Sequence, residues 1–197
     1  MYRILCFSIL LWFSLSSLGF AQEDKNILLQ STQTYLNATQ EKDWKTVLDM
    51  MNPKIFNFAP KAMLEQMYRQ MENDSGMKFL YSEVKILGIK SELTIADTSY
   101  IPVDYAMTIQ IQLNPNLYKN SSDIRTLHQG FEKTYAGQEV VFDQTSSRFL
   151  IDIKNTLIAS SAQYSNLWHF SEYRANDPLL AYILPAEVMD RLLAGWN

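Results

Sequence analysis

Residues 100–113 read YIPVDYAMTIQIQL, and this stretch decides the fold. Every second residue from Ile101 to Leu113 is apolar, while the residues between them are mostly small or polar, such as Asp104 and Gln110. Side chains alternate between the two faces of a strand, so this pattern predicts one long strand with a buried face and a solvated face. Antiparallel sheets permit that arrangement.

The residues before this strand repeat at helical spacing. The pattern predicts a helix over 24–42, a second short helix that starts with the pair Asp43-Trp44, and a third helix that opens at Pro60. Between the last two, Ile55 to Phe58 reads as an apolar connector or an edge strand. The third helix is expected to turn one apolar side inward, made of Met63, Leu64, Met67 and Met71.

The residues after position 76 change to a period of two and predict further strands over 79–90, 139–143, 148–159 and 167–173. An additional helix is expected near 123–135, and short C-terminal helices, the second opened by Pro185, are expected to cover one end of the sheet. Helices followed by strands predict an α+β fold, with N-terminal helices packed on a strongly curved antiparallel sheet.

The first 21 residues have the pattern of a secretory signal peptide. One positive charge at Arg3 precedes a short apolar run, and the small residue Ala21 precedes an acidic stretch. We therefore expect a leader over 1–21 and one mature domain over 22–197. The only cysteine, Cys6, lies in the leader, so no disulfide or thiol chemistry is expected in the mature domain. These features predict an exported bacterial protein, periplasmic or secreted.

The composition excludes several classes of function. Loss of Arg3 with the leader leaves 16 of the 17 basic residues against 21 acidic ones, a formal charge of −5, which argues against nucleic-acid binding. The two histidines lie far apart, and no close pair of acidic residues stands beside either of them, so no metal site is expected. No Gly-rich phosphate loop is present, no cofactor is expected, and no membrane span is expected after leader cleavage.

Three segments resemble the nuclear-transport-factor-2-like superfamily, which is also called cystatin-like. They are EKDWKTVLDMMNPKIF over 41–56, PKAMLEQM over 60–67 and the closing strand LWHFSEY over 167–173. The resemblance covers about 24–173. It implies a cone-shaped α+β domain in which a long helix and a bent sheet enclose a ligand site. On that fold the residues in or near the site would be Tyr35, Trp44, Phe56, Tyr105, Met107, Ile151 and Trp168.

The superfamily contains enzymes as well as proteins that only bind or dimerise, so the fold alone does not name an activity. No catalytic residue pair of its enzymes can be matched to this sequence. We therefore interpret the chain as a non-enzymatic domain that binds a small apolar ligand or a protein partner between the helices and the sheet. One alternative is an isomerase or dehydratase that uses a carboxylate of the site or His128. The other is a structural module that forms homodimers.

Overall fold

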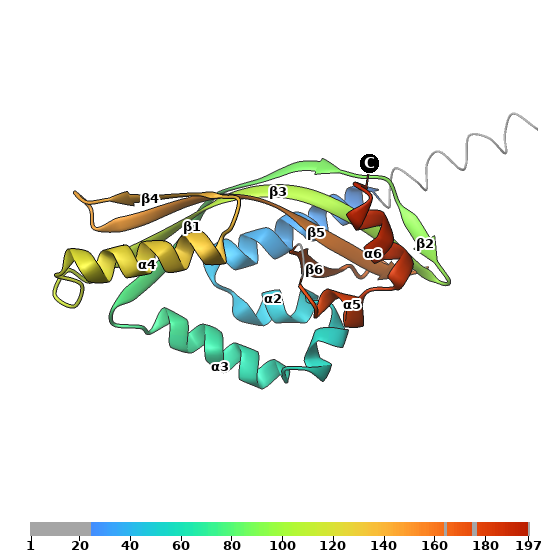
Figure 1. The fold of residues 1–197 in the computed structure, drawn as a ribbon. Helices are drawn as coiled ribbons and strands as arrows, with labels where there is room; N and C mark the ends of the chain where they lie inside the picture. Colours follow the sequence, from blue (N-terminus) through green and yellow to red (C-terminus); the bar gives the residue numbers. More distant parts are fainter. Residues whose placement is uncertain (1–24, 164, 175–176, 197) are drawn as a thin grey trace, which may run out of the picture.

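The computed structural model describes residues 25–163, 165–174 and 177–196, and the predicted leader lies outside these ranges. The described chain is an α+β fold with a six-stranded antiparallel sheet. The strands are β1 (Met77–Ile89), β2 (Leu93–Ile95), β3 (Thr98–Leu113), β4 (Glu139–Asp143), β5 (Arg148–Ala162) and β6 (His169–Tyr173). Their order in the sheet is β1-β3-β5-β4, with β2 also paired to β3 and β6 also paired to β5. Figure 1 shows the long strands arching over the helices.

The helices begin with an N-terminal helix over residues 25–41. It is followed by α2 (Trp44–Met50), the short 3-10 helix η1 (Pro53–Asn57) and α3 (Lys61–Glu72). The later helices are α4 (Ser121–Thr134), α5 (Leu180–Ile183) and α6 (Ala186–Leu193). Among the described residues, no helix has the length and apolar character needed to cross a membrane.

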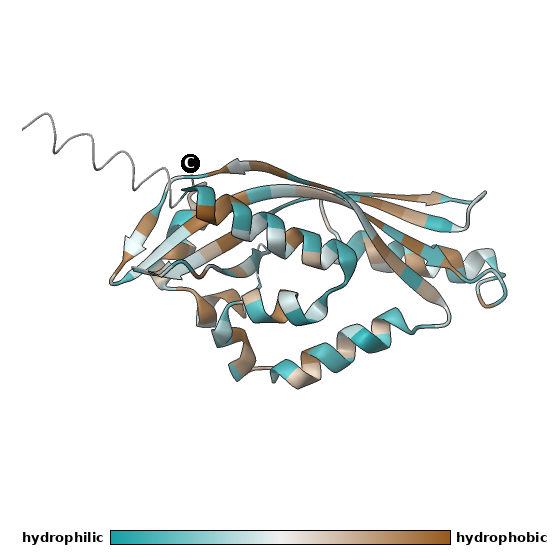
Figure 2. Ribbon diagram, turned by 180° about the vertical axis from the view of Figure 1, so that it is seen from behind, coloured by the Kyte–Doolittle hydropathy of each residue, from teal (hydrophilic) through white to brown (hydrophobic). Residues whose placement is uncertain are grey.

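The predicted alternation of β3 is confirmed. The odd-numbered side chains from Val103 to Leu113 are each at most 7% exposed, and the long strands alternate in hydropathy in Figure 2. β3 pairs with β5 from Thr98↔Ala162 to Gln112↔Arg148, so the two longest strands form the centre of the sheet although α4 and β4 lie between them in sequence. Their shared inner face forms the main core.

Helices cover both faces of the sheet, but at different places. The N-terminal helix buries Leu28 and Leu36 in the main core, and α4 packs Phe131 against the same core. α2 and α3 lie farther from the sheet, as Figure 1 shows. Trp44, at the start of α2, belongs to a small separate hydrophobic core there. At one end of the opposite face, α5 and α6 cover Ile158 and neighbouring side chains, as predicted for the C-terminal helices.

The remainder of the outer face is polar and hydrogen-bonded to itself. Thr108 Oγ1 donates to an Asp152 carboxylate oxygen over 2.7 Å. Arg148 donates to the side-chain oxygens of Gln110, at 2.6 Å, and Gln112, at 3.1 Å. These ladders join neighbouring strands across the solvated face that the alternation predicts.

Both long edges of the sheet are interrupted. β1 is an edge strand, and its pairing with β3 shifts register between Ser82 and Lys85, where Glu83 has a φ of 53°. On the other edge, β4 and β6 pair with separate parts of β5. Between them the Gln138 amide accepts from the Lys154 N–H at 3.2 Å and donates to the Lys154 carbonyl at 3.1 Å. The Gln138 side chain therefore pairs the backbone groups of Lys154, which a neighbouring strand would otherwise pair.

Two local expectations were wrong. The connector at Ile55 to Phe58 is not an edge strand, because Pro53 begins η1 and the Asn52 side chain caps it by accepting from the Lys54 N–H. The expected inward side of the third helix is also rotated, since Met63 is 64% and Met67 is 51% exposed. Met71 packs inward as expected, together with Tyr68, which was not expected there.

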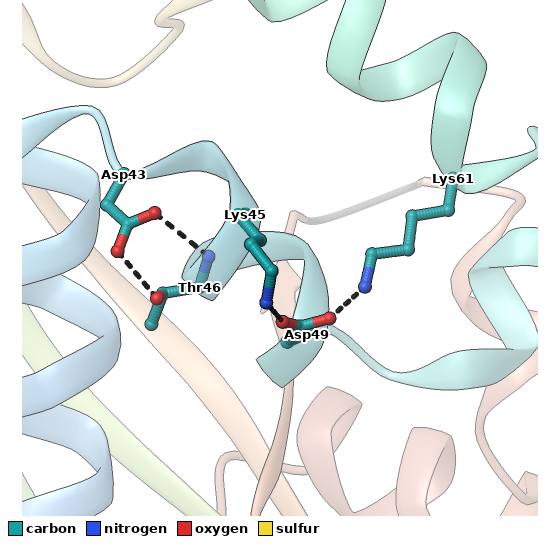
Figure 3. Close-up of polar contacts among 5 residues, drawn as sticks. All are labelled: Asp43, Lys45, Thr46, Asp49 and Lys61. Carbon is teal, nitrogen blue, oxygen red and sulfur yellow. Dashed lines mark hydrogen bonds and ion pairs between the residues drawn. The ribbon is translucent and has the colours of Figure 1, made fainter.

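A small ionic group fixes α2 (Figure 3). The Asp43 carboxylate accepts from the Thr46 N–H at 3.2 Å and from the Thr46 hydroxyl at 2.6 Å, so Asp43 caps the helix that was expected to start here. The carboxylate of Asp49 pairs with Lys45 in the same helix at 2.8 Å and with Lys61 at the start of α3. The hydrogen bonds from Lys45 and Lys61 lower the Asp49 pKa from 3.8 to about 2.

This lowered pKa predicts a loss of stability in acid. A carboxyl group whose pKa is lower in the folded state stabilises the fold above its unfolded pKa, and that contribution is lost as the pH falls through the folded value. We expect Asp49→Asn to be less stable than wild type near pH 6, with most of that difference lost by about pH 2, where the folded-state pKa lies. Urea midpoints at pH 6, 4, 3 and 2 measure the difference. Glu139→Gln, at an exposed position, is the control, and a gap for Asp49→Asn that stays constant with pH would contradict the assignment.

Candidate functional site

One carboxylate on the inner face of the sheet is held by three donors. Glu172 lies on β6, and its Oε1 accepts from the Tyr105 hydroxyl at 3.0 Å and from the Asn155 amide at 2.9 Å. Its Oε2 accepts from Arg174 at 2.9 Å. Tyr105 on β3 and Asn155 on β5 are register partners, so two central strands and β6 place these groups together.

Five tyrosines lie within range of the charge of this carboxylate, and one of them, Tyr105, is hydrogen-bonded to it. They come from the N-terminal helix, α3, β1, β3 and the end of α4, in the order Tyr35, Tyr68, Tyr81, Tyr105 and Tyr135. We call these five residues the tyrosine cluster. No two of its members come from the same helix or strand, so the cluster exists only in the folded chain.

The tyrosine hydroxyls share one electrostatic environment. Burial raises the pKa of every member of the cluster, and the negative charge of Glu172 raises each pKa further. The charge of Glu172 also raises the pKa of the Arg174 guanidinium. All five phenols therefore stay protonated over the physiological pH range and remain hydrogen-bond donors.

The cluster is accessible, and most of its hydroxyls are unused. Tyr105 is buried, whereas the other four tyrosines are half-buried, and the Glu172 side chain is 35% exposed. Within the described residues, the Tyr105 hydroxyl has a hydrogen-bond partner in Glu172, and the hydroxyls of the other four have none. None of the four hydroxyls is fully buried, so water reaches them. These four groups therefore remain available to a bound molecule.

Trp44 extends the aromatic surface beside the cluster. Its ring stacks on Tyr68 with centroids 4.5 Å apart and meets Tyr81 edge-on at 6.4 Å. The indole is 5% exposed, and its N–H is buried without a hydrogen-bond partner. Tyr35 packs its ring against Phe170 at 4.9 Å. Aromatic faces and unpaired donors thus occur side by side.

The residues that the sequence predicts for the site fall into three groups. Tyr35 and Tyr105 belong to the tyrosine cluster, and Trp44 lies against it. The side chains of Met107, Ile151 and Trp168 pack in the main core. Phe56 is half-buried in η1.

Neither histidine is bonded to the carboxylate of the site. The Nε2 of His128 lies 2.9 Å from the Val140 carbonyl and joins α4 to β4. His169 lies on β6 with the parity opposite to Glu172, and its Nδ1 is buried without a partner. Among the described residues, no group of three or more histidine, cysteine or acidic side chains has the geometry to hold a metal ion.

Sequence reasoning missed Glu172, Asn155 and Arg174 as well as three of the tyrosines. One signal was present. In the strand LWHFSEY, the charged Glu172 shares its parity with the core residues Trp168 and Phe170. A charged residue on the apolar side of a predicted strand breaks the local pattern, and such exceptions are expected at functional sites.

Comparison of this chain with protein-family models, with curated proteins and with solved structures gives no match in any of the three. The chemistry of the site therefore has to be understood from its own residues.

Proposed function

We propose that the chain is an exported, non-enzymatic domain that binds a small amphipathic molecule at the tyrosine cluster. The proposal keeps the interpretation of the sequence, a ligand held between helices and sheet, and moves the site from the apolar core to the surroundings of Glu172. It also takes the fold as a cone of the nuclear-transport-factor-2-like kind, in which ligands lie on the inner face of the sheet.

One observation carries the proposal. Four half-buried tyrosines from four different elements present hydroxyls without protein partners around a partly exposed carboxylate. Binding sites for small molecules combine apolar and aromatic walls with a few convergent polar groups. An apolar side chain in place of each of these tyrosines would fill the same space without an unpaired hydroxyl. Polar groups at positions where packing alone calls for apolar ones are typical of functional sites.

An enzyme of the isomerase or dehydratase kind fits the same site less well. A general base needs a free lone pair within reach of a substrate proton. Three donors, at 3.0, 2.9 and 2.9 Å, already occupy most of the acceptor positions on the oxygens of Glu172. His128 is tied to a backbone carbonyl on another element. Binding therefore accounts for the geometry better than proton transfer.

Native mass spectrometry of the exported chain, purified without denaturation, tests the proposal. We expect a discrete mass above that of the polypeptide. In the double variant Tyr68→Phe/Tyr135→Phe, occupancy is expected to fall about tenfold, because each lost hydrogen bond contributes about 0.5–1.5 kcal/mol. The rings remain, so the fold is expected to survive.

Tyr182→Phe is the matched control, since this tyrosine is 71% exposed on α5 and contacts Phe58 instead of the cluster. The control is expected to retain the wild-type mass. An adduct kept equally by the double variant would place the ligand elsewhere. A bare polypeptide mass, with no thermal shift from a concentrated small-molecule extract of the same cells, would contradict ligand binding itself.

A further inference from the structure

We infer that α3 is a movable cover over Trp44, and that the ligand enters and leaves its site where this helix opens. The inference rests on the proposed function and adds the route of access to the site. Three features support it: α3 has no buried side chain, exposed contacts hold it to α2, and a buried donor beneath it has no partner.

The burial of α3 sets it apart from its neighbours. The helix has 12 residues, and none of them is buried. α2 has seven residues and buries Trp44, Val47 and Leu48. Figure 1 shows α3 on the outside of the fold, beyond α2 and away from the sheet. Packing of buried side chains supplies most of the stability of a helix in a folded protein, so α3 opens at a lower free energy than the helices around it.

The contact between α3 and α2 depends on two interactions. The Tyr68 ring stacks on the indole of Trp44, with centroids 4.5 Å apart and an angle of 15° between the planes. Near the start of α3, Lys61 pairs with Asp49 of α2, and these side chains are 41% and 44% exposed. Exposed ion pairs contribute little to stability because water screens them. The stacked ring is therefore the main attachment of α3 to α2.

The donor beneath this attachment is unpaired. The indole N–H of Trp44 is buried and has no hydrogen-bond partner among the described residues. A buried donor without a partner has lost its hydration without compensation, and that cost disappears when water or a ligand reaches it. Trp196 shows the contrast, because its ring is also buried but its N–H donates to the Ser91 carbonyl at 2.8 Å. The closed position of α3 thus carries a cost that opening removes.

Opening of α3 would join this donor to the rest of the site. Trp44 meets the ring of Tyr81 on β1 edge-on at 6.4 Å, and Tyr35 of the N-terminal helix packs in the same small core. Tyr68 belongs to α3 and moves with it. The open chain therefore presents an aromatic surface with an N–H donor beside two tyrosines, at a place that the closed chain seals.

Hydrogen exchange of the indole N–H groups, followed by NMR on the exported chain, tests the inference. The chain is first refolded from urea to free it of ligand. We expect Trp44 to be protected about 100-fold less than the core amides of β3, with little dependence on low urea concentrations, because it exchanges through local opening. The amides of α3 are expected to show the same weak dependence on urea.

Two matched pairs of variants identify the contacts that hold α3. Tyr68→Ala removes the stacked ring and is expected to raise the Trp44 exchange rate about tenfold or more. Met67→Ala, at a 51% exposed position of the same helix, is expected to change it less than about twofold. Lys61→Met removes the ion pair with α2 and is expected to raise the rate about two- to fivefold. Lys45→Met breaks a pair with the same carboxylate inside α2 and is expected to leave the rate unchanged.

The results that overturn the cover are distinct from those that overturn the ligand. Exchange of Trp44 only through global unfolding, with the urea dependence of the β3 amides, would overturn the cover. So would equal effects of Tyr68→Ala and Met67→Ala. A ligand retained before refolding would leave the proposed function standing in either case. A bare polypeptide mass before refolding, with fast local exchange of Trp44, would overturn the ligand and keep the movable helix.

A comparison of the two samples joins the proposals. If the exported chain retains a ligand, we expect its Trp44 N–H to exchange about tenfold or more slowly than in the refolded chain, because a ligand that binds the closed form shifts the opening equilibrium. Equal exchange rates in the two samples would show that the ligand binds independently of α3, and would overturn the cover as its route of access.

Discussion

Replacing Phe149 with alanine is expected to lower the free energy of unfolding by about 3–5 kcal/mol. The side chain is fully buried on β5, and its ring lies 5.0 Å from Phe131 on α4 and 4.7 Å from Phe142 on β4. α4 itself contains no fully buried residue. The attachment of α4 to the sheet therefore depends on the sheet residues that its apolar side contacts. Phe149 lies at the centre of that contact.

Urea denaturation measures the loss, and amide hydrogen exchange shows where it falls. In Phe149→Ala, protection of α4 is expected to drop more than protection of the N-terminal helix. Phe58→Ala removes a ring of the same size that is 53% exposed, and we expect it to cost less than about 1 kcal/mol. A Phe149→Ala cost near that of Phe58→Ala would show that α4 is held by other contacts.

Trp196→Ala is expected to cost a similar amount, about 3–5 kcal/mol. The indole is 3% exposed, and its N–H donates to the Ser91 carbonyl over 2.8 Å. The guanidinium of Arg191 lies 5.2 Å from the centre of the ring. A residue at the C-terminal end thus closes the core that α5 and α6 form over Ile158. Without it, these short helices lose a contact with the connection between β1 and β2, and the hydrogen bond from Arg191 to the Ser91 hydroxyl at 3.4 Å remains.

Trp196→Phe separates the two contributions, because it keeps most of the apolar area and removes the hydrogen bond. We expect a cost of roughly 0.5–1.5 kcal/mol, since the variant loses one hydrogen bond, the one from the indole N–H to the Ser91 carbonyl. Leu193→Ala, at a position that is 71% exposed on α6, is the control and is expected to be nearly neutral. If Trp196→Ala unfolds at the same denaturant concentration as this control, the C-terminal helices do not contribute to global stability.

The architecture could be predicted where a short stretch determines its own structure. The alternation over 101–113 is enough to place β3 and its inner face, because a shift of one residue would expose every apolar side chain. Asp43 is likewise a local signal, since its carboxylate bonds to a residue three positions later. Both depend on contacts within one element.

The errors arose where distant partners decide the outcome. α3 has apolar residues on two sides, and only its contact with Trp44 selects Tyr68 and Met71 over Met63 and Met67. Pattern alone cannot make that choice. The same reason hid the site, because its tyrosines lie on five separate elements and meet at Glu172 only through the pairing of β3, β5 and β6.

The interrupted edges of the sheet have a consequence for how the protein behaves at high concentration. Long, regular edge strands invite other chains to add to the sheet and are a common origin of aggregation. Here β1 loses its regular pairing at Glu83, and the opposite edge is divided into two short pieces around Lys154, whose backbone groups are taken by Gln138. Neither edge offers a continuous template, so the chain is protected against intermolecular strand addition by its own backbone geometry.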